Sequence, residues 1–224
     1  MGHMCIMYEK RYNIPELRKI IWGGLTMARY TEDRLAETLK VLMAEKPLNE
    51  ITVQELMDRA NVNRKTFYYH YHSISDLINW MYCSRLTDII NEADITPDSW
   101  MTLYSSVMKK ARKESPYLAA IYTSDYGPIF RIAIAKCFDR IMTKFVHSSK
   151  RIYEQENNCQ LQITKRQIGY ITHYYSMAFY GMMEEWFLKG MRDSEEYFAH
   201  TMKQISHDNM FRTFRMMHDE NTGQ

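Results

Sequence analysis

The chain has 224 residues, enough for one large or two small domains, and 46% of them are hydrophobic, enough for a buried core. Its formal net charge is only +2, which excludes a protein that holds nucleic acid by overall charge alone, so any such function must depend on where the 29 basic residues lie. Glycine (8) and proline (5) are scarce, whereas methionine (18) and tyrosine (17) are abundant, and this balance favours an all-α fold.

Sequence patterns exclude several further classes of protein. The longest uncharged run, residues 167–183, contains four tyrosines and is shorter than the ~20 apolar residues of a membrane span. The early apolar patch at residues 20–25 is too short for a signal peptide. The four cysteines are far apart and form no C-x-x-C pair, which predicts free thiols in a reducing cytoplasm and no metal site. Dinucleotide-binding, Walker, nucleophile-elbow and zinc-protease motifs are absent, so we expect no enzyme, no catalytic residues and no cofactor.

Residues 1–26 are predicted to be a tag remnant followed by an N-terminal extension. The first four residues, MGHM, look like the scar of a cleaved tag. Two alternatives remain for the rest of this segment. It is either translated leader upstream of a natural start at Met27, or an N-terminal arm whose cations add phosphate contacts. The arm's cations are Lys10, Arg11, Arg18 and Lys19.

The first predicted helix runs from Thr31 to Glu45, with Leu35, Leu39 and Leu42 on one apolar face. The stretch from Ile51 to Leu77 then reads ITVQELMDRANVNRKTFYYHYHSISDL. It predicts a helix over 53–60, a tight turn over 61–63 and a second helix from residue 64 to about residue 71.

The second of these short helices has one apolar and one polar side. Thr52 and Asn63 are positioned to cap the two helices, and Val62 is the one apolar residue of the turn. Phe67 and Tyr71 lie four residues apart, so we expect both to face the core. The remaining side chains of the second helix suit phosphates and base edges, and no acid lies between Arg59 and His72. These side chains are Arg64, Lys65, Thr66, Tyr68, Tyr69 and His70.

This motif resembles the helix-turn-helix of the TetR (tetracycline-repressor-like) family of bacterial regulators. The shared features are the cap, the turn, the T-F-Y run and the start of the following helix. Two positions depart from the family pattern, because Asn61 stands where glycine is usual and Ile74 where a phosphate-contacting lysine is common. The resemblance implies an all-α fold, with a three-helix DNA-binding domain at residues 27–74 and a helical regulatory and dimerisation domain at residues 75–224.

The resemblance also implies a function, namely a dimeric, sequence-specific transcriptional regulator that binds a palindromic operator on double-stranded DNA. Its recognition helices would lie about one DNA turn (~34–36 Å) apart. Arg64 and Thr66 are expected to approach base edges, and the other residues to hold phosphates or support the contact. These other residues are Thr52, Asn63, Lys65, Tyr68, Tyr69 and His70.

The C-terminal part predicts further helices over 75–91, 100–114, 116–122, 129–153, 164–189 and 194–217. Asp98 or Ser99 is expected to cap the helix from 100, and Asp193 with Glu196 to begin the last one. The helix over 164–189 is apolar on two sides and needs two partners, of which the second is most simply another subunit. We therefore expect a homodimer through the last two helices. The expected contacts of the last helix are Phe198, Met202, Ile205 and Phe211.

The methionines and tyrosines between residues 100 and 191 have two interpretations. They are either ordinary helical core or the lining of an adaptable small-molecule pocket. The predicted lining is Trp100, Tyr104, Met108, Tyr117, Phe130, Ile134, Tyr174 and Met177. This set contains no charged group, so a neutral or apolar effector is favoured, and the leading hypothesis is a repressor controlled by such a molecule.

A narrower resemblance supports an alternative. The N-R-K-T-F-Y-Y-H-Y and E-E-W-F-L-K-G runs are similar to the dihydroxyacetone-kinase-regulator-like subgroup, which implies a protein co-regulator, and in some members activation, without a ligand pocket. A cavity of several hundred Å³ would favour the small-molecule sensor, and a packed regulatory domain the protein co-regulator. An all-α enzyme is the remote alternative. Glu184 and Glu185 point about 100° apart on a helix and do not converge on one substrate, and His200 and His207 are too far apart for one metal ion.

Overall fold

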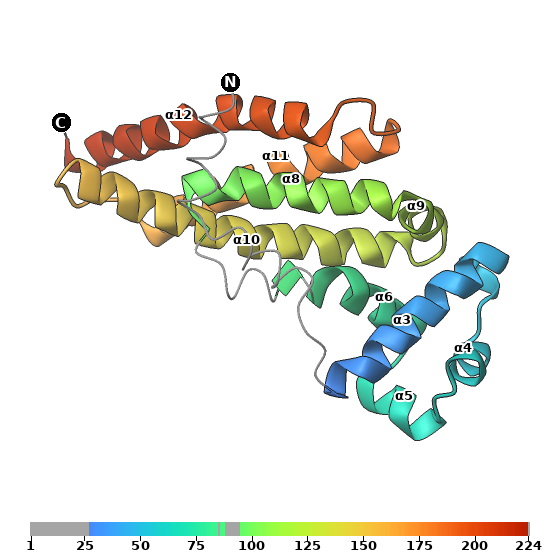
Figure 1. The fold of residues 1–224 in the computed structure, drawn as a ribbon. Coiled ribbons are helices and arrows are strands. Elements are labelled where there is room, and N and C mark those ends of the chain that lie inside the picture. Colours follow the sequence, from blue (N-terminus) through green and yellow to red (C-terminus); the bar gives the residue numbers. More distant parts are fainter. Residues whose placement is uncertain (1–26, 85, 88–94, 224) are drawn as a thin grey trace. The chain divides into compact units, whose positions relative to one another are not determined.

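The computed structural model describes residues 27–84, 86–87 and 95–223, and every regular element in these residues is a helix (Figure 1). The predicted N-terminal extension lies outside the described residues. The chain divides into two compact units, Met1–Ala93 and Asp94–Gln224. The all-α prediction is confirmed.

The described part of the first unit contains four α-helices and two short elements. The elements are α3 (Met27–Glu45), η1 (Leu48–Glu50), α4 (Val53–Ala60), α5 (Arg64–His70), α6 (Ile74–Asn79) and the π-helical η2 (Trp80–Ser84). Helix α3 begins four residues before the predicted start at Thr31, and η1 was not predicted. Leu35, Leu39, Leu56, Phe67 and Leu77 are fully buried and form the core of this unit.

Helix α6 belongs with this unit, although residues from 75 on were predicted to belong with the regulatory domain. Its residues Ile74, Leu77 and Ile78 are buried, and the helix packs on α3. The cap is Ser73, whose hydroxyl accepts a hydrogen bond from the Asp76 N–H at 3.1 Å. The helix therefore begins at Ile74, one residue before the predicted start. The predicted helix over 75–91 changes to π-helix at Trp80, and residues 88–91 lie outside the described part.

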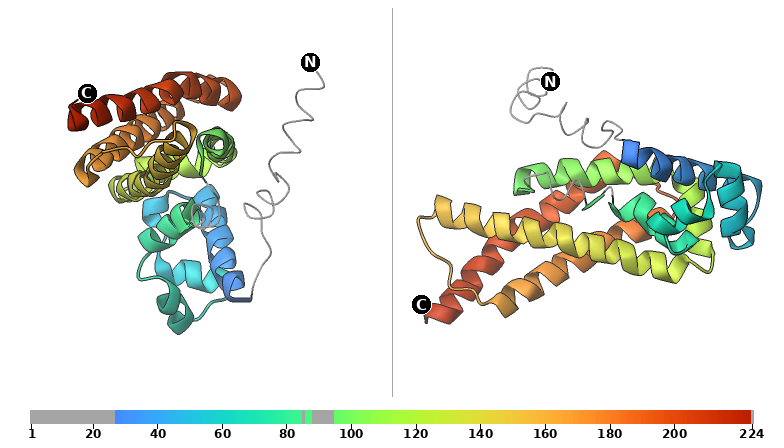
Figure 2. Two further views of the ribbon diagram at one scale, coloured as in Figure 1. Left: turned by 90° about the vertical axis from the view of Figure 1, so that its left-hand side faces the viewer. Right: turned by 90° about the horizontal axis from the view of Figure 1, so that it is seen from below.

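The second unit is built from four long helices and one short one. They are α8 (Pro97–Lys113), α9 (Ser115–Thr123), α10 (Gly127–Glu156), α11 (Lys165–Leu188) and α12 (Glu195–Thr222). Helix α10 lies beside α11, and α8 lies beside α12 (Figure 2). An aromatic cluster fills the core, in which the Trp100 ring lies 5.0 Å from that of Phe179 and the Tyr104 hydroxyl donates to the Phe179 carbonyl at 2.8 Å.

Several predicted helix ends are wrong by a few residues. Thr96, not the predicted Asp98 or Ser99, caps α8 in a reciprocal capping box with Ser99, so the helix begins earlier than predicted. Helix α10 runs to Glu156, three residues beyond the predicted end at residue 153. Helix α12 continues to Thr222, beyond the predicted end at Met217, and Asn221 near its end donates to the carbonyl of Gln162 at 2.6 Å.

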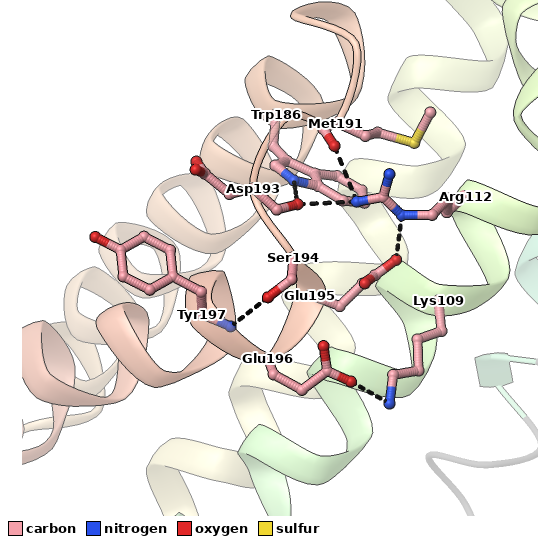
Figure 3. A network of polar contacts seen from close by, with 9 residues as sticks. All are labelled: Lys109, Arg112, Trp186, Met191, Asp193, Ser194, Glu195, Glu196 and Tyr197. Carbon is pink, nitrogen blue, oxygen red and sulfur yellow. Dashed lines mark hydrogen bonds and ion pairs between the residues drawn. The ribbon is translucent and has the colours of Figure 1, made fainter.

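The turn between α11 and α12 is held by one arginine of α8 (Figure 3). Arg112 donates to the Glu195 carboxylate and to the carbonyls of Met191 and Asp193, at 2.9 and 2.8 Å for the two carbonyls. Its guanidinium also lies 5.2 Å from the centre of the Trp186 ring. The turn needs this support because Met191 has a φ of +53°, in the left-handed region that favours glycine. Ser194, not the predicted Asp193, caps α12.

The outward faces of α11 and α12 carry large apolar side chains. On α11, Tyr174 is 69% exposed and Met177 49% exposed, and Tyr170 and Leu188 lie on the same side. These residues fall within an arc of about 60° on the helix surface, opposite the buried side. On α12 the predicted outward residues Phe198 and Met202 are buried in their own subunit, because the Phe198 ring packs on Trp186 and Tyr104. Of the other two predicted contacts, Ile205 is exposed and Phe211 is half-buried, and Tyr197 and Met216 are further exposed apolar residues of α12.

No helix in the described residues is long and apolar enough to cross a membrane.

Candidate DNA-binding site

Helices α4 and α5 are set by two side-chain caps, both at the predicted residues. The Thr52 hydroxyl accepts from the Glu55 N–H at 3.2 Å, and the Asn63 carboxamide oxygen accepts from the Thr66 N–H at 2.8 Å. Each cap satisfies one of the free N–H groups at a helix start. The Thr52 hydroxyl hydrogen and the Asn63 side-chain NH₂ are not used by the caps, so both remain possible donors to a phosphate.

The turn between the two helices depends on Asn61. This residue has φ 49° and ψ 50°, the left-handed conformation that asparagine tolerates better than most residues other than glycine. Its N–H donates back to the Asp58 carbonyl, and the next N–H, that of Val62, donates to the Met57 carbonyl at 3.0 Å. The Val62 side chain, the one apolar side chain of the turn, is buried.

Helix α5 presents the predicted polar face. Phe67 and Tyr71 are buried and in ring contact, with their centroids 6.0 Å apart. Arg64, Lys65, Tyr68 and Tyr69 are exposed, Tyr69 by 84%, and Thr66 and His70 are half-buried. The Arg64 guanidinium lies 5.2 Å from the centre of the Tyr68 ring, a cation–π contact that holds the arginine along the outside of the helix.

His70 is placed differently from the other predicted contacts. Its Nδ1 lies 3.3 Å from the Glu32 carboxylate of α3, and both side chains are about one-fifth exposed. The structure therefore gives His70 a partner inside its own unit. Its predicted phosphate contact stays a prediction, as do the predicted roles of the other residues of the face.

The cations around α4 are paired, which leaves those of α5 as the exposed charge of the motif. Arg59 lies 2.6 Å from Glu45, and Lys46 lies 2.5 Å from Glu55. The hydrogen bond from Lys46 lowers the pKa of the Glu55 carboxyl below its ordinary value of 4.5. Arg64 and Lys65, by contrast, extend from the exposed side of α5.

The residues of the predicted ligand pocket do not enclose a common space. Trp100, Tyr104, Met108, Phe130 and Ile134 are buried core residues. Tyr117 is half-buried, and Tyr174 and Met177 lie on the exposed face of α11. The enclosed space next to Trp100 measures about 10 Å³, the volume of about one water molecule, and of the eight predicted residues only Trp100 lines it. A wide depression at the end of α10, near Asn158 and Cys159, is open to solvent.

The two adjacent carboxylates of α11, Glu184 and Glu185, have separate partners. Glu184 accepts from the Tyr180 hydroxyl at 2.7 Å, whereas Glu185 pairs with Lys189 at 2.5 Å, so the two carboxylates diverge as predicted. In the described residues no group of three or more His, Cys, Asp or Glu side chains is placed to hold a metal ion.

Glu32 and Arg34 are the residues near the site that sequence reasoning missed. They belong to α3, and their contacts are with His70 and Asn61, far away along the chain. Local periodicity could identify the buried side of α3, but it carries no signal for polar contacts over such distances.

Comparison with known proteins agrees with this geometry. The family model for the N-terminal part of bacterial regulatory proteins of the tetR family matches residues 36–80, and a TetR model described as a transcriptional regulator C-terminal region matches residues 98–208. The chain belongs to the TetR family. It is therefore a DNA-binding transcriptional regulator, as its helix-turn-helix predicts.

One curated protein and one solved structure are similar over most of the chain. The HTH-type dhaKLM operon transcriptional activator DhaS of Lactococcus lactis subsp. lactis (strain IL1403) is 19% identical over 162 residues, which are 71% of this chain and 81% of that protein. A solved structure described as the dihydroxyacetone kinase operon activator DhaS superposes with a TM-score of 0.61 at 16% identity. That superposition covers 84% of this chain and 98% of the solved chain, and it supports the fold.

Proposed function

We propose that this TetR-family regulator acts in the cytoplasm as a homodimer that reads a palindromic operator with α5 of each subunit. The observation that carries this proposal is the exposed face of α5, where Arg64, Lys65, Tyr68 and Tyr69 stand outward on a helix capped and packed from behind. Arg64 and Thr66 approach base edges in the major groove. Phosphates are held by Thr52, Lys65, Tyr68, Tyr69 and His70, with Asn63 beside them.

The apolar faces of α11 and α12 support the homodimer. Tyr170, Tyr174, Met177 and Leu188 form one exposed stripe on α11, and Tyr197, Ile205 and Met216 another on α12. Such large apolar side chains favour a partner surface, and two-fold pairing buries the same stripes on both subunits. The resulting four-helix interface fixes the distance between the two recognition helices.

We further propose that the regulatory signal comes from a protein partner, and that the response is activation. The space of about 10 Å³ beside Trp100 is far smaller than the ~300–1,000 Å³ of a small-molecule site. The depression near Asn158, at about 520 Å³, is large enough, but it is open to solvent and does not enclose a ligand. The second unit is instead filled by its own aromatic residues, such as Tyr104 and Phe179. Activation is also the role in the name of the Lactococcus lactis relative. The small-molecule sensor and the repressor are the competing hypotheses.

Selection of bound duplexes from a random DNA pool, at two salt concentrations, tests the first proposal. A palindromic consensus with half-sites about one helical turn apart is expected. Binding that shows no sequence preference at either salt concentration would contradict it.

The source of the signal is tested with the selected operator. Affinity is measured in the presence of a cell extract that has been divided by dialysis into a small-molecule and a protein fraction. Only the protein fraction is expected to change the affinity or the transcription from the operator. A change produced by the dialysable fraction alone would support the small-molecule sensor instead.

A further inference from the structure

Helix α3 contacts the turn before the recognition helix and the end of that helix through polar side chains. In the turn between α4 and α5, Arg34 Nη2 donates to the carbonyl of Asn61 at 2.9 Å. At the end of α5, Glu32 lies 3.3 Å from His70 Nδ1. Glu32 and Arg34 are two residues apart on α3, whereas Asn61 and His70 lie on either side of the face proposed to read DNA.

The contact of Arg34 acts on the residue that shapes the turn. Asn61 has a left-handed backbone. Arg34 is half-buried: its Nε is buried and has no acceptor among the described residues, and its guanidinium lies 5.7 Å from the Tyr30 ring centre, while its hydrogen bond to Asn61 is at the surface. A side chain held in this way restrains the carbonyl of Asn61, and with it the direction in which α5 leaves the turn.

The contact of Glu32 restrains the other end. The side chains of Glu32 and His70 are only 21% and 18% exposed, so the pair is shielded from solvent more than most surface pairs. The neighbouring Tyr71 is buried beneath α5 and fixes the apolar side of the same end. Apolar packing through Tyr71 holds α5 against the core of the unit. The two polar contacts, from Arg34 and Glu32, resist rotation and tilting of the helix.

We propose that Glu32 and Arg34 are positioning residues for DNA recognition, which set the orientation of α5 without contacting DNA. This inference rests on the proposed role of α5 in reading the operator. A base-edge hydrogen bond tolerates only a few tenths of an ångström of misplacement, whereas a phosphate contact through a long flexible side chain tolerates more. Loss of either contact therefore reduces discrimination between sequences more than it reduces general affinity for DNA.

The test compares Arg34→Ala, Arg34→Lys and Glu32→Gln with the unmodified full chain, using the selected operator and an unrelated duplex of equal length. Arg34→Ala is expected to weaken operator binding by about 3- to 10-fold, as for the loss of one hydrogen bond. Binding to the unrelated duplex and the slope of log affinity against log salt concentration stay unchanged, because no phosphate contact is lost. Lysine at position 34 can still donate to the Asn61 carbonyl and restores part of the discrimination.

Two controls separate positioning from folding. Glu37→Gln changes an exposed carboxylate of the same helix and is expected to leave both affinities unchanged. Thermal unfolding is followed for every variant, and if Arg34→Ala is unfolded, Glu32→Gln and Arg34→Lys carry the test. An equal loss on both duplexes, or an unchanged ratio in folded variants, would overturn the inference. If the unmodified chain itself does not discriminate, the proposed function fails instead.

Discussion

At the scale of single residues, the recognition surface depends on very few charges. The net charge is +2, and the exposed cations of α5 are Arg64 and Lys65, while Arg59 and Lys46 are paired with carboxylates behind them. Ile74 is buried at the position where the family often has a phosphate-binding lysine. Each of the two exposed cations should therefore have a large and separable effect on DNA binding.

Arg64→Ala should reduce discrimination between the operator and variants with one altered base pair by roughly 1–3 kcal/mol. The reason is that a guanidinium offers a planar pair of donors which alanine lacks, and the Tyr68 ring holds this guanidinium in place. Competition binding against single-base variants measures the effect. An equal loss for all sequences would show that Arg64 contacts phosphate and not a base.

Lys65→Ala, unlike Arg64→Ala, should leave discrimination between sequences unchanged. It should reduce the affinity for operator and for unrelated DNA by a similar factor. Removal of one phosphate contact lowers the magnitude of the slope of log affinity against log salt concentration by about 1. Titrations at four or more salt concentrations measure that slope. A slope equal to that of the unmodified protein would contradict a phosphate contact at this residue.

The Lys46–Glu55 pair predicts a pH dependence of the DNA-binding unit. The folded-state pKa of Glu55 is lowered, so the carboxylate stabilises the folded state above its ordinary value of 4.5, and this stabilisation is lost as pH falls through the folded-state pKa. Lys46→Met should raise the pKa of Glu55 toward 4.5, as measured by NMR titration. Lys65→Met, which changes the net charge equally without touching this pair, should leave the pKa of Glu55 unchanged.

At the scale of elements, local signals predicted the DNA-binding motif better than the rest of the chain. The bounds of α4 and the start of α5 are confirmed, because Thr52, Asn61 and Asn63 are short-range caps and turn residues. The caps of α8 and α12 were misassigned, because several neighbouring residues, such as Asp193 and Ser194, are equally suitable in sequence. Only the geometry of the turn decides which side chain accepts the hydrogen bond from a free N–H at the start of the helix.

The turn between α11 and α12 provides a test of element-scale stability. Arg112→Met should destabilise the second unit by roughly 1–3 kcal/mol, because it leaves the Glu195 carboxylate, whose side chain is only 10% exposed, without its cation, although Arg112 itself is 40% exposed. Lys109→Met removes the neighbouring pair with Glu196, in which both side chains are more than half exposed, and should cost less than ~1 kcal/mol. Chemical denaturation of both variants measures the difference. Equal effects would mean that Arg112 does not hold the turn.

At the scale of the whole molecule, periodicity predicted which helices are long and that α11 has two apolar sides, but not which residues meet in the core. Ile132, an apolar residue of α10, is 58% exposed, since it lies about 200° around the helix from the buried Phe130. The eight residues predicted to line a ligand pocket do not surround one common cavity, for a similar reason. Its residues are apolar and of suitable size, but whether such side chains line a cavity or fill it depends on the packing of several helices at once.

The exposed stripe of α11 leads to a prediction about assembly and DNA binding together. Tyr174→Glu combined with Met177→Glu places two carboxylates in the middle of that stripe, where pairing with a second subunit would bury them facing their own symmetry copies. The variant should be monomeric by analytical ultracentrifugation and should lose most of its affinity for the full palindrome, while binding to a single half-site is retained, because each α5 is unchanged. Ile132→Glu, which alters a comparably exposed apolar residue of α10, should remain dimeric. A dimeric Tyr174→Glu, Met177→Glu variant would show that the subunits associate through another face.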